Sequence, residues 1–103
     1  MDNKIHYSPK SLSDLDEIFD YIAFELNDII AADNAVNGII DSIDILKQFA
    51  ESGSILYLPT GEVTIYRYII SGNYLSFYHL SENEIYIDRI IYGKRDYIKI
   101  LGL

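Results

Sequence analysis

The sequence contains no cysteine, which excludes a disulfide framework, a thiolate nucleophile and a thiolate metal site. A chain without cysteine fits a reducing compartment, and we expect a cytoplasmic protein. Long apolar runs are also missing: the longest unbroken runs extend over only a few residues, whereas a membrane-spanning helix needs about 20. The first residues after Met1 are polar, so the sequence predicts no signal peptide and no association with a membrane.

Histidine is scarce as well, because His6 and His79 are the only two. A structural zinc site takes about four nitrogen or sulfur ligands, and this pair cannot supply them. The sequence also lacks a glycine-rich phosphate loop, an HExxH pattern and a serine nucleophile elbow. We therefore predict no metal site and no cofactor.

The chain of 103 residues carries a net charge of −8, and this charge is unevenly distributed. Residues 1–62 hold twelve acidic and three basic residues, whereas residues 63–103 hold four acidic and five basic ones. A uniformly acidic protein is repelled by nucleic acid, so direct DNA binding is not expected. The split permits a local basic face, although solvated acidic helices are the simpler interpretation. The length and the hydrophobic content predict a single domain, 1–103.

Two amphipathic helices are predicted in the acidic half. Ser8 and Pro9 suit the N-cap and the first helical position, and apolar residues then recur at helical spacing as far as Leu26. Asp28 can cap a second helix. This helix is expected to end before Gly53, with Gly53 itself in the left-handed conformation that closes many helices. Because the link between the helices is short, they are expected to lie antiparallel as a hairpin.

Strand patterns flank this hairpin. A short strand is expected at residues 4–7, a connector at 54–61, and three strands joined by tight turns at 63–70, 74–80 and 85–92. The first strand has to pair with a later one, beside the last strand or at an edge, in either direction. The expected fold is α+β in two layers, with the N-terminal strand and a C-terminal three-strand meander in a mostly antiparallel sheet under the hairpin.

The last of these strands contains an arginine in an apolar row. Strand alternation places Arg89 on one face with Ile85, Ile87 and Ile91. Such an arginine must snorkel, pair with a carboxylate or face a partner. Its candidate structural partners are Asp88, Asp96 and an acid of the early first helix, and a functional role is equally open.

Several stretches share their order and spacing with one protein family. They are IHYSP at 5–9, Arg67, YLSFY at 74–78 and the ending IYIDRIIYGKRDY at 85–97. Together they resemble the RelE/ParE superfamily of bacterial toxins, known also from plasmid stabilisation systems, over nearly the whole chain. The GKRD ending is closer to the ParE-like branch.

This resemblance implies the toxin of a type II toxin–antitoxin module, inhibited by an antitoxin protein that wraps it and occupies its groove. We expect the antitoxin to cover the helical hairpin or to add a strand at the sheet edge. ParE-like members inhibit DNA gyrase and are not known for a hydrolytic site. The leading hypothesis is therefore growth inhibition by binding a protein such as DNA gyrase. Its candidate target-binding residues are Arg67, Arg89, Lys94, Arg95 and Tyr97.

Two alternatives remain open, and with them the question of whether the chain is an enzyme. A RelE-like endoribonuclease would cut mRNA on the ribosome, with Arg67 and Arg89 supplying charge and His79 and Tyr92 proton transfer. An inactive module would only bind its antitoxin. Family toxins are usually basic and their antitoxins acidic, so the charge of −8 is a departure. It is compatible with a protein target, an unusually basic antitoxin segment, or a toxin that no longer poisons.

Overall fold

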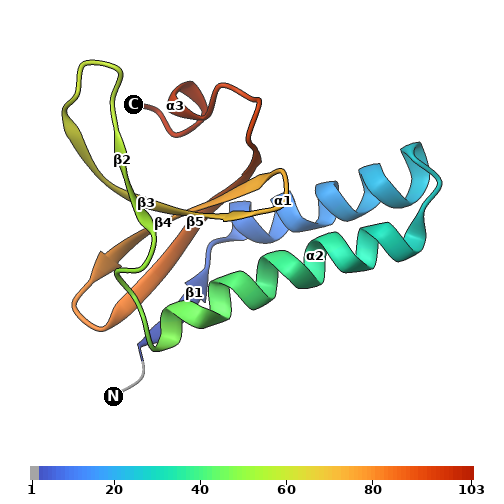
Figure 1. Ribbon diagram of the computed structural model, residues 1–103, viewed down its shortest axis with the longest axis horizontal. Coiled ribbons are helices and arrows are strands. Elements are labelled where there is room, and N and C mark those ends of the chain that lie inside the picture. The colour runs from blue at the N-terminus through green and yellow to red at the C-terminus, as the bar shows by residue number, and fades with distance from the viewer. Residues whose placement is uncertain (1–2) are drawn as a thin grey trace.

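The computed structural model describes residues 3–103. Two long helices cover one face of a five-stranded sheet, as Figure 1 shows. The predicted two-layer α+β fold, with its N-terminal strand, helical hairpin and C-terminal meander, is confirmed. The elements are β1 (Lys4–Tyr7), α1 (Pro9–Asp20), α2 (Ile29–Asp44), β2 (Ser54–Tyr57), β3 (Val63–Ser71), β4 (Tyr74–Ser81), β5 (Glu84–Tyr92) and α3 (Tyr97–Ile100).

The strands follow the order β1-β5-β4-β3-β2 across the sheet. β1 lies at one edge beside β5, as predicted, and the pairing that the sequence left open is parallel. β2 corrects the prediction of a plain connector at residues 54–61. Ile55 of β2 pairs with Arg67 of β3, so the start of this segment forms the other edge strand. β2 has only four residues, and so short a strand leaves a weak pattern in the sequence.

Both predicted helix starts are confirmed by their caps. The Ser8 hydroxyl accepts a hydrogen bond from the Ser11 amide at 3.0 Å and donates one to the Asp88 carbonyl at 2.9 Å, so the cap also joins α1 to β5. The Asp28 carboxylate accepts from the Ala31 amide at 2.9 Å. α1 ends before Leu26, because the chain continues from Asp20 as a π-helical turn, Tyr21–Glu25.

Apolar clusters occupy both faces of the sheet. The larger one lies between the sheet and the helices, and its fully buried members are Ala32, Ile39, Ile43, Leu46, Tyr78, Ile85 and Ile87. The smaller one, formed by Leu56, Phe77 and Ile91, lies on the opposite face. The C-terminal segment covers this smaller cluster, with Tyr97 packed on Phe77 at 5.2 Å between ring centroids.

A β-bulge in β5 changes which side chains share a face. Phe77 pairs with Arg89, but the next residue of β4 pairs with Ile87, so Asp88 is an extra residue. Ile90 therefore joins Ile87 in the helix-side cluster, while Ile91 belongs to the opposite one. The prediction that Arg89 lies in one row with Ile85, Ile87 and Ile91 is wrong, because the bulge interrupts strict alternation.

Buried and half-buried tyrosines predict a loss of stability at high pH. Burial raises the pKa of Tyr7 to about 12, with a contribution from the Asp44 charge, and burial also raises the pKa values of Tyr66, Tyr74 and Tyr78. The folded chain therefore holds these protons more tightly than the unfolded chain, whose tyrosines ionise near pH 10. The stabilisation is fully present below pH 10 and is lost as the pH rises towards about 12.

Urea midpoints measured from neutral pH to pH 12 test this expectation. Tyr7→Phe is the matched variant, because the Tyr7 hydroxyl is buried and makes no hydrogen bond within residues 3–103. We expect Tyr7→Phe to lose less stability above pH 10 than the parent chain. Equal alkaline slopes for the two chains would show that Tyr7 does not contribute.

Candidate functional site

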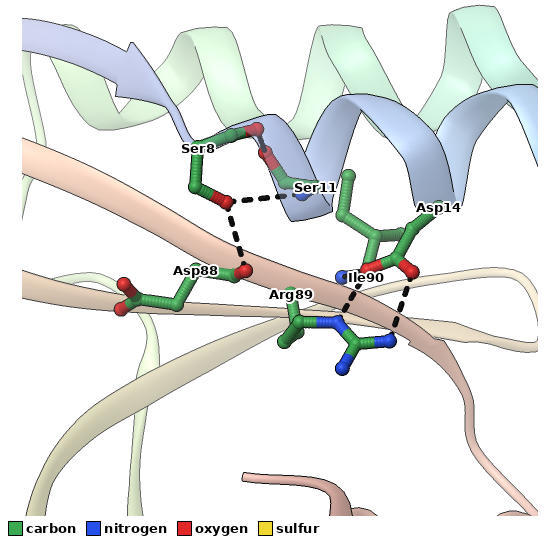
Figure 2. A network of polar contacts seen from close by, with 6 residues as sticks. All are labelled: Ser8, Ser11, Asp14, Asp88, Arg89 and Ile90. Atoms are coloured by element: carbon green, nitrogen blue, oxygen red, sulfur yellow. Dashed lines mark hydrogen bonds and ion pairs between the residues drawn. The ribbon is translucent and has the colours of Figure 1, made fainter.

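Arg89 is held by a carboxylate of the first helix, as Figure 2 shows. Its guanidinium donates two hydrogen bonds to Asp14, at 2.8 and 3.0 Å, and the Ile90 amide donates a third to the same carboxylate at 2.9 Å. Asp14 is buried, and its hydrogen bond raises the pKa of Arg89. Of the partners proposed from the sequence, the early-helix acid is therefore the one observed. The pair joins α1 to the bulged part of β5.

Arg67 is held by backbone carbonyls at the other end of the hairpin. Its guanidinium donates to the Glu51 carbonyl at 3.1 Å and to the Gly53 carbonyl at 3.0 Å. The neighbouring Tyr78 hydroxyl donates to the Ala50 carbonyl at 2.9 Å and accepts from the Gly53 amide at 3.0 Å. These contacts fix the turn that leads from α2 into β2.

His79 lies on the face of the sheet opposite the helices, next to Asp88 at 2.5 Å between Nδ1 and Oδ2. The His79 ring stacks on Tyr86 at 5.1 Å, and Tyr86 stacks on His6 at 5.0 Å. The His6 ring also contacts the Glu84 carboxylate. Cross-strand aromatic packing of this kind stabilises a sheet, and it also presents ring surfaces to a partner. We call this row of rings the histidine row; its members are His6, Tyr86, His79 and Tyr66.

Tyr92 lies far from the histidine row, in a groove between the end of the hairpin and the sheet. It packs against its cross-strand neighbour Tyr74 at 5.9 Å. Burial raises the pKa of Tyr74, and the nearby Tyr92 and Tyr21 hydroxyls raise it further, so three phenols meet in this groove. The groove encloses about 940 Å³. We call it the tip groove; its main apolar lining residues are Ile18, Tyr21, Ile22, Leu26, Tyr74 and Tyr92.

The predicted C-terminal residues divide between two environments. Lys94 and Arg95 are exposed after β5, and Arg95 lines the tip groove. The Gly93 amide donates to the Asn73 carbonyl at 2.8 Å, which fixes the start of this segment. Tyr97 packs on the sheet instead of extending into solvent.

The four residues proposed for RNA cleavage are not brought together. Arg67 is held at the turn after α2, Arg89 at Asp14, His79 in the histidine row and Tyr92 in the tip groove. Within residues 3–103, no three potential ligand side chains are placed to hold a metal ion. Within the same residues, no helix has the length and apolar content of a membrane crossing.

Sequence reasoning missed the hairpin's contribution to the tip groove. Leu26 belongs to the apolar stripe predicted for the first helix, but it is 57% exposed, and Tyr21 at the start of the π-helical turn is 54% exposed. The π-helical turn that exposes them leaves no mark in the apolar spacing, so no sequence signal identified it.

The fold is shared with a toxin–antitoxin protein. The chain is similar to a chain of the chromosomal ParDE TA system from P. aeruginosa, with 26% sequence identity and a TM-score of 0.73. The match covers 89% of this chain and 97% of that one. Residues 5–97 match the family described as ParE toxin of type II toxin-antitoxin system, parDE, and the chain therefore belongs to this family. A search of curated proteins gave no match.

Proposed function

We propose that this ParE-family chain is a cytoplasmic toxin that inhibits growth by binding a protein, with DNA gyrase as the candidate target, and that a cognate antitoxin neutralises it. The observation that carries the proposal is that both sheet arginines already have hydrogen-bond partners within the fold. A ribonuclease needs free cations at the scissile phosphate, whereas Arg67 and Arg89 are engaged by carbonyls and by Asp14. Family membership supports the same conclusion.

The exposed segment after β5 supplies the proposed target contact. Lys94 and Arg95 are both exposed, and the hydrogen bond from Gly93 to Asn73 holds their backbone against the β3–β4 turn. The remaining candidates in the sheet have structural partners elsewhere, Arg67 at the turn after α2 and Arg89 at Asp14. Tyr97 anchors the far end of the segment on Phe77.

Reversal of both exposed charges, Lys94→Glu with Arg95→Glu, is expected to lower growth inhibition by about tenfold or more. The reason is that a charge reversal in a contact replaces attraction by repulsion while the buried core stays intact. Colony counts after induction without antitoxin give the measurement. Lys10→Glu, an exposed charge reversal on α1, is the matched control and should keep full toxicity. Equal toxicity of the two variants would remove this segment from the target contact.

The target itself is tested by inducing the chain without antitoxin while recording the SOS response and mapped mRNA ends. SOS induction with intact mRNA supports a gyrase poison. Cleavage within translated codons without an SOS signal would overturn the proposal in favour of the RelE-like endoribonuclease. Absence of growth arrest would overturn it in favour of an inactive antitoxin-binding module.

One observation favours the ribonuclease as the second candidate. The His79–Asp88 pair joins an imidazole to a carboxylate that can orient it, on a sheet face with neighbouring aromatic rings. If cleavage is observed, His79→Gln should abolish it and His6→Gln should not. The opposite pattern would exclude His79 as the proton-transfer group.

A further inference from the structure

β2 forms one edge of the sheet, because the strand order ends in β3-β2. Its outer side therefore presents backbone N–H and C=O groups that have no neighbouring strand among residues 3–103. Folded proteins usually blunt such an edge with charged residues or proline, but β2 has the sequence SILY and contains neither. In Figure 1, β2 and the turn after it extend away from the two helices, so the hairpin does not cover this edge.

Exposed apolar side chains accompany the open backbone of β2. Ile55 and Tyr57 lie on either side of the buried Leu56, and both are exposed. On β3, Val63 pairs with Tyr57 and is 67% exposed, and Ile65 is 71% exposed. We call Ile55, Tyr57, Val63 and Ile65 the edge patch. An open edge strand that carries apolar residues is a site for pairing with another strand.

The opposite edge of the sheet is protected. The exposed residues of β1 are Lys4 and His6, and both are polar. The backbone just before β1 already has a partner, since the Asn3 amide donates to the Lys47 carbonyl at 2.9 Å. A positive charge and a neighbouring segment both keep an edge from pairing. β2 is therefore the edge that is open to another strand.

The distribution of charge favours a second copy of this chain at β2. Residues 9–44 hold nine acidic residues and one basic residue, whereas residues 54–66 hold a single charged residue, Glu62. Two copies, each at −8, therefore repel each other most through their hairpins and least at their edge patches. In an antiparallel pair of β2 strands, three strand spacings of about 4.8 Å separate the two β3 strands. This separation exceeds the Debye length of about 8 Å at 0.15 M ionic strength, so the hairpins are screened from each other.

We propose that β2 pairs antiparallel with β2 of a second copy, so that two chains form a two-fold symmetric dimer with one continuous sheet. A strand paired antiparallel with its own copy is self-complementary, which is the geometry that a two-fold axis requires. Each Ile55 side chain then packs beside Tyr57 of the second copy across the axis. Each copy contributes one such edge, so the assembly closes at two chains.

The dimer leaves the proposed target contact free. β3 runs from Val63 in the edge patch to Ser71 in the tip groove, so the patch and the groove lie at opposite ends of this strand. Arg95 lines the tip groove, and its segment is therefore remote from the two-fold axis. One dimer presents two of these exposed basic segments. A target with two matching sites would bind it more tightly than it binds a single chain, through avidity.

Sedimentation velocity of the purified full chain tests the dimer. As the concentration rises from about 1 to about 500 μM, the mass should increase from one towards two chains of 11.8 kDa. Micromolar affinity is expected because a four-residue strand and its side chains bury a small interface, about 1,200 Å² or less in total. The dimer should be at least about threefold tighter at 0.5 M than at 0.05 M ionic strength, because salt screens the repulsion between two acidic chains.

Hydrogen exchange and a charged variant locate the pairing. The amides of residues 54–57 should exchange more slowly at about 500 μM than at about 1 μM, whereas those of residues 24–30 at the end of the hairpin should not change. Tyr57→Glu should weaken the dimer by at least about tenfold, because it places a charge among apolar contacts. Tyr21→Glu is the matched control, since Tyr21 and Tyr57 are both 54% exposed, and it should leave the affinity unchanged.

A cross-link tests the position of the axis. The chain has no cysteine, so Ile55→Cys supplies a single thiol near the two-fold axis. A bismaleimide that spans about 10 Å, which exceeds two strand residues and one strand spacing, should join two chains of this variant. Ile45→Cys, an exposed position at the end of the second helix, is the control and should not be joined. Circular dichroism confirms that each variant is folded.

A mass of one chain at about 500 μM, or a mass above two chains, would overturn the inference. So would a dimer that Tyr21→Glu abolishes and Tyr57→Glu does not, or cross-linking of Ile45→Cys alone. Slower exchange of residues 54–57 that requires added antitoxin would overturn it too, by assigning the edge to that partner. Growth arrest by a chain that stays monomeric would remove this inference and leave the proposed function.

Discussion

Asp14→Ala is expected to lower the free energy of unfolding by about 3 kcal/mol, the lower end of the range for breaking a buried ion pair. The change leaves the Arg89 guanidinium without its carboxylate and the buried Ile90 amide without its acceptor. Asp14 is 7% exposed, so water cannot fully replace either contact. The Arg89 side chain is 22% exposed, which allows partial hydration and limits the loss.

Urea unfolding at neutral pH measures this effect, with Asp16→Ala as the control. Asp16 lies on the same helix but is exposed, so its replacement should change stability by no more than about 0.5 kcal/mol. The double variant Asp14→Ala with Arg89→Met should recover part of the loss, because it removes the unpaired charge. If Asp14→Ala unfolds at the same urea concentration as Asp16→Ala, the pair does not stabilise the fold.

Gly53→Ala is expected to cost about 3 kcal/mol as well, through overpacking and the loss of buried hydrogen bonds. A Cβ atom at this position would overlap the Tyr78 hydroxyl and lie 2.9 Å from the Tyr68 carbonyl oxygen. Tyr78 is fully buried and cannot rotate away. Its hydroxyl also bonds the Gly53 amide, so displacement of the ring breaks that contact.

Gly38→Ala is the matched control for this prediction, because it makes the same chemical change inside α2. There a Cβ atom would meet only the Ser71 hydroxyl oxygen, at 3.4 Å, and alanine is the better helix former by up to about 1 kcal/mol. Thermal unfolding should therefore show a large decrease for Gly53→Ala and no decrease for Gly38→Ala. Comparable midpoints for the two variants would show that residue 53 has room for a side chain.

Local signals in the sequence predicted where both long helices start, whereas α1 and α2 end earlier than predicted, at Asp20 and Asp44. Ser8, Pro9 and Asp28 act within a few residues of their own positions, so their roles could be inferred without knowledge of the fold. Gly53 shows the limit of such inference. A left-handed conformation was expected there, but positive φ angles occur at Gly61, Gly72 and Gly102 and not at Gly53. Glycine is needed at this position because a distant tyrosine approaches its backbone.

Non-local pairing accounts for what the sequence did not predict. The bulge at Asp88 depends on how β5 aligns with β4, and nothing in the β5 sequence marks the extra residue. The parallel direction of β1 depends in the same way on the position of β5. The sequence identified the candidate site residues by their chemical type, but it could not identify the residues that contact them in the folded chain. Arg89 and Arg67 were identified as cations, and the structure supplies the partners that occupy them.

The parallel pairing of β1 with β5 has a consequence for synthesis on the ribosome. Lys4 pairs with Glu84 and Tyr7 with Ile87, and β5 lies between β1 and β4 in the sheet. The first strand therefore has no neighbour in the sheet until β5, about eighty residues later, has been translated. Contacts of such high sequence separation form late and slowly. A nascent chain consequently cannot complete its sheet before β5 has emerged from the ribosome, so β1 waits for the last strand.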